Sequence, residues 1–417
     1  MLKKNKGLRE LSLRGGWGLN YKMPSMIYLY PENAYKDMVS FNYTDFDASG
    51  YGMNLITTKV VETSNPSLRP QRSRNIEAGI EFDSKPVRGS VVYFNEKMTD
   101  GYGFVTEFLP MVYNRYGYQW KDRSHSSVVR LDEFYRSGMQ FGYGGGILAT
   151  SDGTSVPSIS DTTFISYRRP VNGIENDKWG VEFTLDFAKI KPINTTISVS
   201  GAYMNISTRH TRYDWQLYSG SAGGRSYPYV GIYGGSTTAS TGSVKDRLSA
   251  NIRFITHIPS IGMAITLTAQ MVFMDRTRNQ SEFGGEILPY FYDEAGNRIS
   301  GEQALYDTQH TKYVNPIMIM DRSGRLTPFT REMETDPRFR DLIITTNTST
   351  YYISQNYPFY GMLNLRLTKE IKKIATISFY ANNFLNLRGR VYNSVTHYPI
   401  DRNTPIYFGA EVKITIR

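Results

Sequence analysis

Residues Lys245–Phe254 read KDRLSANIRF, and this stretch decides the fold class. Its even-numbered positions from Leu248 to Phe254 are apolar, and the residues between them are polar. A period of two residues predicts a β-strand with one apolar and one polar face. The partner strand follows directly in Met263–Phe273, where the odd-numbered positions are apolar. Together the two segments predict an antiparallel hairpin.

The same alternation recurs along the whole chain and predicts about ten strands. Each is close to the ten residues that a tilted strand needs to cross a bilayer. The chain is therefore predicted to be all-β, with antiparallel strands. The remaining segments are Leu11–Tyr21, Asn75–Asp83, Ser90–Glu96, Trp179–Phe187, Thr195–Ile206, Leu363–Leu367, Ala375–Asn382 and Ile406–Ile416.

The linkers between these segments are alternately short and long. Short turns on one side of a sheet and long loops on the other are typical of outer-membrane barrels, with turns in the periplasm and loops outside the cell. The short linkers are Ser84–Gly89, Ala188–Asn194, Pro259–Gly262 and Ile371–Ile374. The long linkers are Met98–Asn176, His210–Gly242 and Arg278–Gln355.

Composition argues against most enzyme classes. The chain has no cysteine and five scattered histidines, so we predict no metal centre and no cofactor. Paired acids four residues apart on a strand lie about 13 Å apart, too far for the paired carboxylates of a glycosidase. The formal net charge of +10 is dispersed along the chain, which does not predict nucleic-acid binding. No apolar run is long enough for a spanning helix.

Charged residues in the middle of the polar strand faces distinguish a membrane barrel from a soluble β-sandwich. A water-filled lumen accepts full charges on every second residue, and aromatic residues near strand ends, such as Trp17 and Tyr203, suit the two membrane interfaces. We therefore predict that a set of nine charged residues lines a lumen. These are Glu77, Glu81, Glu182, Asp186, Arg247, Arg253, Arg366, Glu411 and Lys413.

Three motifs resemble the C-terminal part of the β-barrel of TonB-dependent outer-membrane transporters, in particular the Bacteroidetes type. Lys22–Met26 with the following Leu-Tyr-Pro resembles a strand end that leads into an extracellular loop. Asn65–Pro70 resembles the entry to the next descending strand and is the most specific of the three, although Gln71 replaces the usual glutamate. Ala381–Asn386 resembles the penultimate strand, and the chain lacks the aromatic C-terminal residue of many outer-membrane barrels.

The resemblance implies that residues 1–417 are the C-terminal portion of one outer-membrane barrel domain. The plug domain and the N-terminal strands of the family have no counterpart, and no signal peptide is visible. An open ten-strand sheet would leave two unpaired edges in lipid, so we expect the missing strands to pair with Leu11–Tyr21 and Thr404–Arg417. Expected partners are outer-membrane lipid, that missing part, the TonB complex acting through the plug, and a substrate-capturing surface lipoprotein.

Aromatic residues of the long linkers are candidates for ligand contact. Aromatic loops on the outer side of a barrel suit the capture of glycans or peptides, although they also pack on one another. A basic cluster, Arg69 with Arg72 and Arg74, would either attract acidic lipopolysaccharide or hydrate a loop. The aromatic candidates are Tyr102, Tyr116, Trp120, Tyr227 and Tyr229.

The predicted function is that of a receptor and transporter barrel that takes up a nutrient such as a glycan, a peptide or a metal complex. A plugless porin or outer-membrane adhesin is the alternative, and a secreted β-rich glycan-binding protein or hydrolase is the third. The apolar rows of Met263–Phe273 and Leu363–Leu367 argue against the secreted protein, because it would have to dissolve without detergent.

Overall fold

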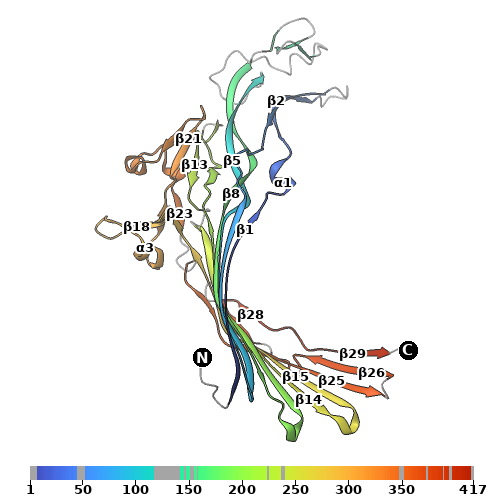
Figure 1. The fold of residues 1–417 in the computed structure, drawn as a ribbon. Coiled ribbons are helices and arrows are strands. Elements are labelled where there is room, and N and C mark those ends of the chain that lie inside the picture. Colours follow the sequence, from blue (N-terminus) through green and yellow to red (C-terminus); the bar gives the residue numbers. More distant parts are fainter. Residues whose placement is uncertain are drawn as a thin grey trace.

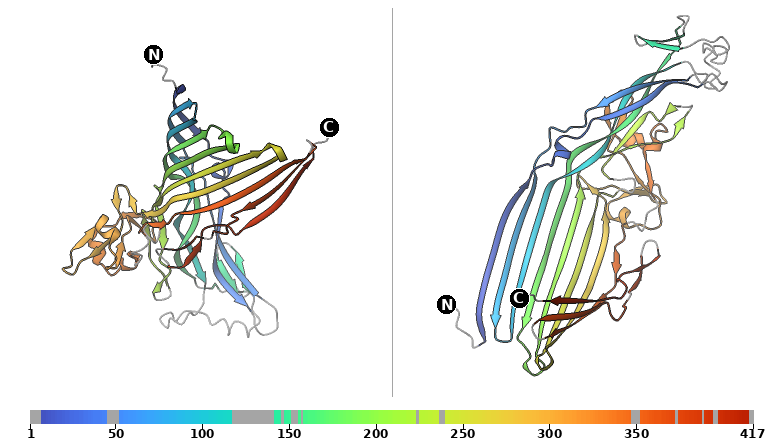
Figure 2. Two further views of the ribbon diagram at one scale, coloured as in Figure 1. Left: turned by 90° about the horizontal axis from the view of Figure 1, so that it is seen from below. Right: turned by 90° about the vertical axis from the view of Figure 1, so that its right-hand side faces the viewer.

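A computed structural model shows one large antiparallel sheet whose strands follow one another in chain order, apart from the hairpins inserted at one end (Figures 1 and 2). We call its ten main strands the wall. The structure describes residues 7–44, 52–116, 141–144, 147–150, 155–156, 158–222, 225–235, 240–346, 352–371, 374–387, 389–393 and 397–414. The wall strands are β1 (Leu8–Lys22), β4 (Gln71–Ser84), β5 (Val87–Tyr116), β8 (Ser158–Phe187), β9 (Thr195–His210), β14 (Gly242–Ile258), β15 (Met263–Gln280), β25 (Tyr360–Ile371), β26 (Ala375–Asn382) and β29 (Tyr407–Ile414).

The predicted strands and the alternation of short and long connections are confirmed. Each of the ten predicted segments overlaps one wall strand, and the four short connections all lie at the same end of the wall. Two of these turns are single 3-10 turns, η1 (Lys191–Ile193) and η2 (Pro259–Ile261). Each closes on a left-handed residue, Asn194 or Gly262, a conformation that asparagine and glycine tolerate best. The chain therefore reverses within a few residues, and the turn fixes which residues pair.

Strand register joins the apolar faces of successive strands into one continuous surface. One row crosses from β1 to β25 through directly paired residues, and the adjacent row, one residue along, is polar almost throughout. We call these surfaces the apolar face and the polar face of the wall. The apolar row is Leu13, Ile80, Val91, Phe183, Gly201, Ala250, Met271 and Gly361. The polar row is Ser12, Glu81, Ser90, Thr184, Ser200, Asn251, Gln270 and Met362.

The apolar face is uncovered by protein. Leu13 is 75% exposed and Val412 is 62% exposed, although leucine and valine rarely remain in water. On β8 the outward apolar residues run from Trp179 to Phe187, about 26 Å along the strand. That length equals the apolar band of a membrane barrel, about 25 Å tall. The face has the size and chemistry to contact lipid.

Aromatic rings cover glycines that lie directly opposite them on the wall. Gly201 faces Phe183, and Gly89 faces Phe82. A Cβ atom at either glycine would lie 2.6 Å from the facing ring, so no larger residue fits without moving that ring. The ring therefore fills the gap that the glycine leaves in the apolar face.

Strands β5 and β8 are much longer than predicted. Each has 30 residues, which at about 3.3 Å per residue extend about 100 Å, well beyond one bilayer. The prediction of a loop over Met98–Asn176 was wrong in its limits, because β5 continues to Tyr116 and β8 begins at Ser158. Beyond the apolar band both faces meet water or other protein segments. The period-two apolar pattern that reveals a half-buried strand is therefore absent there.

Shorter elements lie near β15 and β25 and around this projecting hairpin. The hairpin of β2 and β3 packs against it through a buried cluster of Val61, Met111 and Ile165. These elements are α1 (Met26–Leu29), β2 (Ala34–Thr44), β3 (Gly52–Val61), β6 (Phe141–Gly144), β7 (Ile147–Thr150), β24 (Gln355–Tyr357), β27 (Arg390–Tyr392) and β28 (Pro399–Asp401).

The two other long connections fold together into a small mixed structure that we call the loop module. It gathers on one side of the upper wall (Figure 1), and its strands form two four-stranded sheets, β10-β13-β21-β22 and β19-β18-β20-β23. Its elements are β10 (Asp214–Leu217), β11 (Ser221–Ala222), β12 (Arg225–Ser226), β13 (Tyr229–Tyr233), β16 (Glu282–Phe283), β17 (Glu286–Ile287), β18 (Tyr290–Tyr292), β19 (Arg298–Ser300), α3 (Glu302–Tyr306), β20 (Lys312–Val314), β21 (Met318–Asp321), β22 (Leu326–Pro328), η3 (Arg331–Thr335), η4 (Arg340–Leu342) and β23 (Ile344–Thr346).

The loop module has a core of its own. Val230 of β13 and Met320 of β21 are buried, and they pack on Phe164 of the projecting part of β8. A second cluster joins Ile319 to Phe339 and Leu342. The module is thus attached to the wall by apolar packing as well as by the chain.

Candidate functional site

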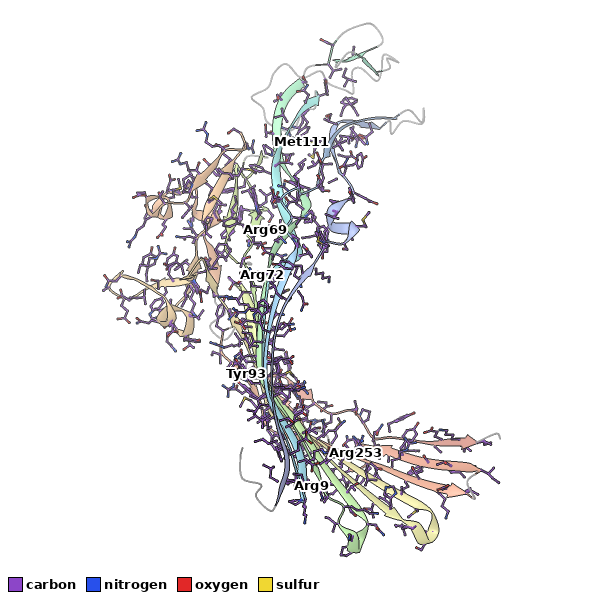
Figure 3. The ribbon with its side chains drawn as sticks, in the orientation of Figure 1. Arg9, Arg69, Arg72, Tyr93, Met111 and Arg253 are labelled. Carbon is purple, nitrogen blue, oxygen red and sulfur yellow. The ribbon has the colours of Figure 1, made fainter. Side chains whose placement is uncertain are left out.

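The polar face of the wall is the candidate functional site. Strand register places all nine residues predicted to line a lumen on this face, although they come from five different strands. Figure 3 labels Arg253 in the lower wall, among strands whose side chains project from both faces. The register that assigns the nine residues to one face is that of β1 with β4, β4 with β5, β5 with β8, β8 with β9, β9 with β14, β14 with β15, β15 with β25, β25 with β26 and β26 with β29.

The structure brings only some of the nine together. Arg366 Nη2 lies 2.8 Å from Glu411 Oε2 and donates a hydrogen bond to Ser378 Oγ at 3.1 Å. Glu81 pairs with Arg14 at 3.7 Å. Within the described part of the chain, the other six predicted residues form no ion pair. Hydration rather than pairing thus has to stabilise most of these charges, which requires the face to stay wet.

Two shallow hollows on the polar face show where solute and water have room. Each has a volume of about 390 Å³, and Thr184 and Asp186 line both. The first hollow also contacts Glu81 and Arg88, and the second contacts Arg253. Carboxylates, a guanidinium and hydroxyls line these hollows, so they suit a hydrated polar solute rather than an apolar one.

A segment that the sequence did not reveal folds onto the polar face. We call the described residues between β26 and β29 the strap; these are residues 383–387, 389–393 and 397–406. Asn383 N donates to Asn364 Oδ1 at 2.9 Å, and Asn403 Nδ2 donates to the Gly361 carbonyl at 2.9 Å. Its strand β28 lies beside the wall in Figure 1. The strap therefore covers part of β25 instead of extending away from the wall as a free loop.

Arg402 anchors the strap to β15, the wall strand next to β25. Its guanidinium pairs with the carboxylate of Asp275 on β15 and donates to Tyr360 Oη at 3.1 Å. The Tyr357 ring lies 3.9 Å from the guanidinium carbon. Arg402 and Asp275 are only 14% and 7% exposed, so this pair is dry whereas Arg366 and Glu411 are half exposed. An arginine in the long connection before the last strand was its only signal in the sequence.

Two aromatic residues predicted to contact ligand hold the loops in place. Tyr102 Oη donates to the Lys22 carbonyl at 2.7 Å and accepts from Gln71 N at 2.9 Å. The ring of Tyr102 also lies 5.2 Å from that of Tyr28. Tyr116 is 7% exposed. Tyr116 is thus buried away from a solute, and the hydroxyl of Tyr102 is already bound to the backbone. Trp120 lies outside the described residues.

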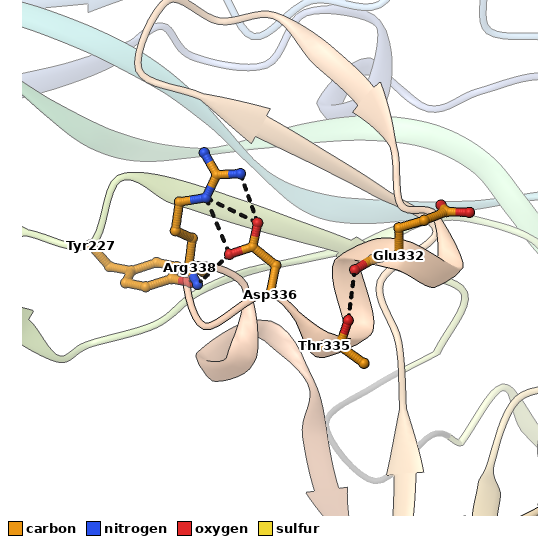
Figure 4. A network of polar contacts seen from close by, with 5 residues as sticks. All are labelled: Tyr227, Glu332, Thr335, Asp336 and Arg338. Atoms are coloured by element: carbon orange, nitrogen blue, oxygen red, sulfur yellow. Dashed lines mark hydrogen bonds and ion pairs between the residues drawn. The ribbon is translucent and has the colours of Figure 1, made fainter.

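Tyr227 and Tyr229 belong to an aromatic cluster of the loop module. The rings of Tyr227 and Tyr229 are 6.0 Å apart, and Tyr229 lies 5.0 Å from Phe339. Tyr227 Oη donates to the Arg338 carbonyl, next to the Arg338–Asp336 ion pair (Figure 4). Burial, together with the nearby Asp341, raises the pKa of Tyr227 to about 12. Both rings remain partly exposed, so the cluster keeps a surface that a ligand can reach.

Neither a metal site nor a spanning helix is found in the described ranges. No group of three or more metal-binding side chains gathers among those residues. The helices there are all too short or too polar to cross a bilayer.

Comparison with known proteins matches the first part of the wall to a protein family. Residues 7–121 match the family model described as TonB dependent receptor-like, beta-barrel, and this range contains wall strands β1, β4 and β5. None of the curated proteins compared with the chain is significantly similar to it. Members of the matched family are outer-membrane transport proteins and not enzymes. Residues 7–121 are thus similar to the β-barrel of TonB-dependent receptors, a barrel of the outer membrane, and the two-faced wall agrees with that similarity.

Proposed function

We propose that the chain is the C-terminal portion of the barrel of a Bacteroidetes-type TonB-dependent transporter that imports a nutrient such as a glycan, a peptide or a metal complex. The observation that carries this proposal is the polar face, where charges lie on every wall strand from β4 to β29 except β9 and β26. A face of this kind needs water, while the opposite face needs lipid. Together they describe the wall of a solute pathway.

Closure of the barrel follows from the same proposal. Among the described strands, β1 and β29 each pair with one neighbour only. Lipid cannot satisfy the remaining backbone groups, so further strands have to pair with both edges. A plug domain inside the closed barrel would then contact the polar face, and the TonB complex would act through that plug. A surface lipoprotein that captures substrate would contact the loop module.

The two faces can be tested with single cysteines, because the chain has none of its own. Asn251→Cys and Ile252→Cys place the thiol at neighbouring positions of β14 on opposite faces. In intact outer membranes, we expect a charged, water-soluble thiol reagent to modify Asn251→Cys at least tenfold faster than Ile252→Cys. Equal rates would contradict a lumen on the polar side.

Energy coupling separates this transporter from a plugless porin. Cells that contain the whole protein are given labelled maltoheptaose, a labelled pentapeptide or ferric citrate, with and without a protonophore. The proposal predicts that at least one solute accumulates, and that accumulation stops when the protonophore collapses the inner-membrane potential. Entry that continues at the same rate would support a diffusion pore instead.

A further inference from the structure

A row of cations lies on the outward side of the wall, directly above the apolar band. On β4, Arg72 and Arg74 continue the outward series that begins with Ile76. Lys97 of β5 pairs directly with Arg74 in the strand ladder. Directly opposite side chains have Cβ atoms about 5 Å apart, and alternate residues of one strand lie about 7 Å apart. The three cationic side chains therefore start from one small patch, which we call the cationic patch.

The structure redraws the basic cluster that the sequence suggested. Arg69 is not part of the patch, because its guanidinium lies 2.6 Å from Asp100 Oδ1 and its backbone binds the side chain of Asn172. Lys97 takes its place, although it is 23 residues further along the chain than Arg74. Strand pairing, and not sequence proximity, creates the patch.

Acidic groups do not neutralise the patch. Asp177 faces Lys97 across the ladder, but the two form no ion pair, and the Asp177 carboxylate instead accepts from Asn95 Nδ2 at 3.1 Å. Within the described chain, Arg72 and Arg74 form no ion pair either. Arg74 Nε is buried and has no hydrogen-bond partner there. Three cations thus face one carboxylate.

Cations at a similar height on β9 and β15 have other interaction partners than those of the cationic patch. On β9, Arg209 lies 3.2 Å from Glu175 of β8. On β15, Arg276 faces Asp246 across the ladder, and Arg278 Nη1 donates to Tyr306 Oη at 3.4 Å. Among the described residues, two of the three cations on those strands therefore pair with or face a carboxylate, whereas in the cationic patch only Lys97 faces one.

The surroundings of the patch have the two-part chemistry of a lipid site. Below it lies the apolar band, where Trp17 is 68% exposed, Ile80 is 48% exposed and Tyr93 is 42% exposed. Figure 3 labels Tyr93 in the lower wall and Arg72 nearer the loop module. Indole and phenol rings favour the membrane interface, which places the cations at the level of lipid head groups. A phosphate there can accept hydrogen bonds from the two guanidinium groups and the ammonium group.

We propose that the cationic patch binds the head-group phosphate of an anionic lipid in the leaflet next to the long loops. The acyl chains of that lipid lie against the outward residues of β1, β4 and β5. This site is on the lipid side of the wall, so it serves attachment and orientation in the membrane and is independent of transport through the lumen. Free phosphate lacks the acyl contacts and binds the patch far more weakly.

Lipid retention in native mass spectrometry tests the site. The protein, purified in a neutral detergent, is incubated with equal amounts of dioleoyl phosphatidic acid and dioleoylglycerol, which differ only in the phosphate. We expect at least tenfold greater retention of the phosphorylated lipid, and no competition from 1 mM inorganic phosphate. In the variant Arg72→Gln/Arg74→Gln/Lys97→Gln, that preference should fall to within about twofold, since each cation near a phosphate contributes roughly a fivefold effect.

A matched control carries the same charge change at the same height. Arg209→Gln/Arg276→Gln/Arg278→Gln removes three cations from β9 and β15 and should keep the preference of the unaltered protein. Arg72→Gln alone should give an intermediate value, and its side chain is exposed, so the fold does not depend on it. Unchanged retention in the first triple variant, or an equal loss in the control, would overturn the proposal.

Discussion

The wall and the loop module distribute apolar residues in opposite ways. In the wall, residues such as Leu13 and Val412 point outward and are uncovered, while the nine charged residues predicted to line a lumen share the opposite face. In the loop module, Val230 and Ile232 are 0% exposed, and charged residues such as Arg338 lie at the surface. The distribution of apolar residues thus suits two different solvents, lipid around the wall and water around the module. An exposed apolar side chain is therefore not by itself a sign of misfolding or of a protein interface. Its meaning depends on whether lipid or water surrounds it.

The strongest test uses the dry ion pair between Arg402 and Asp275 on the polar face. Arg402→Met leaves Asp275 buried without its partner, and such a loss costs about 3–5 kcal/mol. Guanidinium titration in detergent micelles, followed by tryptophan fluorescence, measures the change. Arg390→Met is the control, because its pair with Asp401 on the same strap is 76% and 53% exposed and should contribute little. Equal small losses would mean that the strap leaves the polar face wet.

Charge placed on the lipid side should have the next largest effect. Ala250→Arg puts a guanidinium in the middle of the apolar face, at a cost of about 2–4 kcal/mol near the bilayer midplane. We expect much less folded protein in the outer-membrane fraction. Asn251→Arg is the neighbour on the polar face and should assemble normally. An equal loss of folded protein in both variants would contradict the assignment of one face to lipid and the other to water.

A cavity in the loop module should destabilise the module and spare the wall. Met320 is 4% exposed and packs on Val230 and Phe164, so Met320→Ala should cost about 2 kcal/mol or more. Hydrogen exchange should accelerate in β13 and β21 and stay unchanged in β14. Leu326→Ala on β22 removes an exposed side chain and should have little effect. Faster exchange throughout the wall would show that the two regions unfold as one.

High pH should loosen the loop module by a smaller amount. Because the pKa of Tyr227 is raised from 10 to about 12 in the folded protein, the neutral phenol is favoured by folding. Its contribution is complete below pH 10 and is lost as the pH rises through 12. Limited proteolysis of the module between pH 9 and 12 measures this loss, and Tyr227→Phe should remove that part of the pH dependence. An identical profile in the variant would assign the transition to other groups.

The smallest effect is expected for the exposed pair on the polar face. Arg366 and Glu411 are 49% and 53% exposed, so Arg366→Gln should change the unfolding free energy by less than about 1 kcal/mol. The same guanidinium titration as for Arg402→Met allows a direct comparison. A loss as large as that of Arg402→Met would show that the lumen side of β25 is dry.

The wall was predictable from the sequence because lipid imposes its pattern on every strand. Between Trp179 and Phe187 each second residue has to be apolar, which leaves a period that can be read without a structure. The same reasoning placed all nine charged residues on one face. Whether they line a lumen remains a proposal.

The loop module and the strap were not predictable, because no lipid contact imposes a period-two pattern on their sequences. The residues of β13 and β21 that form one core are about 90 positions apart, and the buried pair joins Arg402 to Asp275 across two connections. Tyr102 and Tyr116 were predicted to be free aromatic residues of a loop. The neighbouring sequence does not indicate that Tyr102 binds the Lys22 carbonyl or that Tyr116 is buried. The cationic patch also depends on pairing that only the strand register reveals.

The tight reversals at Asn194 and Gly262 have a consequence for how such proteins diversify. Each turn fixes the register of its two strands independently of the opposite end of the hairpin. A long connection can therefore be exchanged, lengthened or shortened as a whole, and the ladder below it does not slip. The end of the wall that carries the short turns can therefore stay constant while the long loops that recognise ligands change.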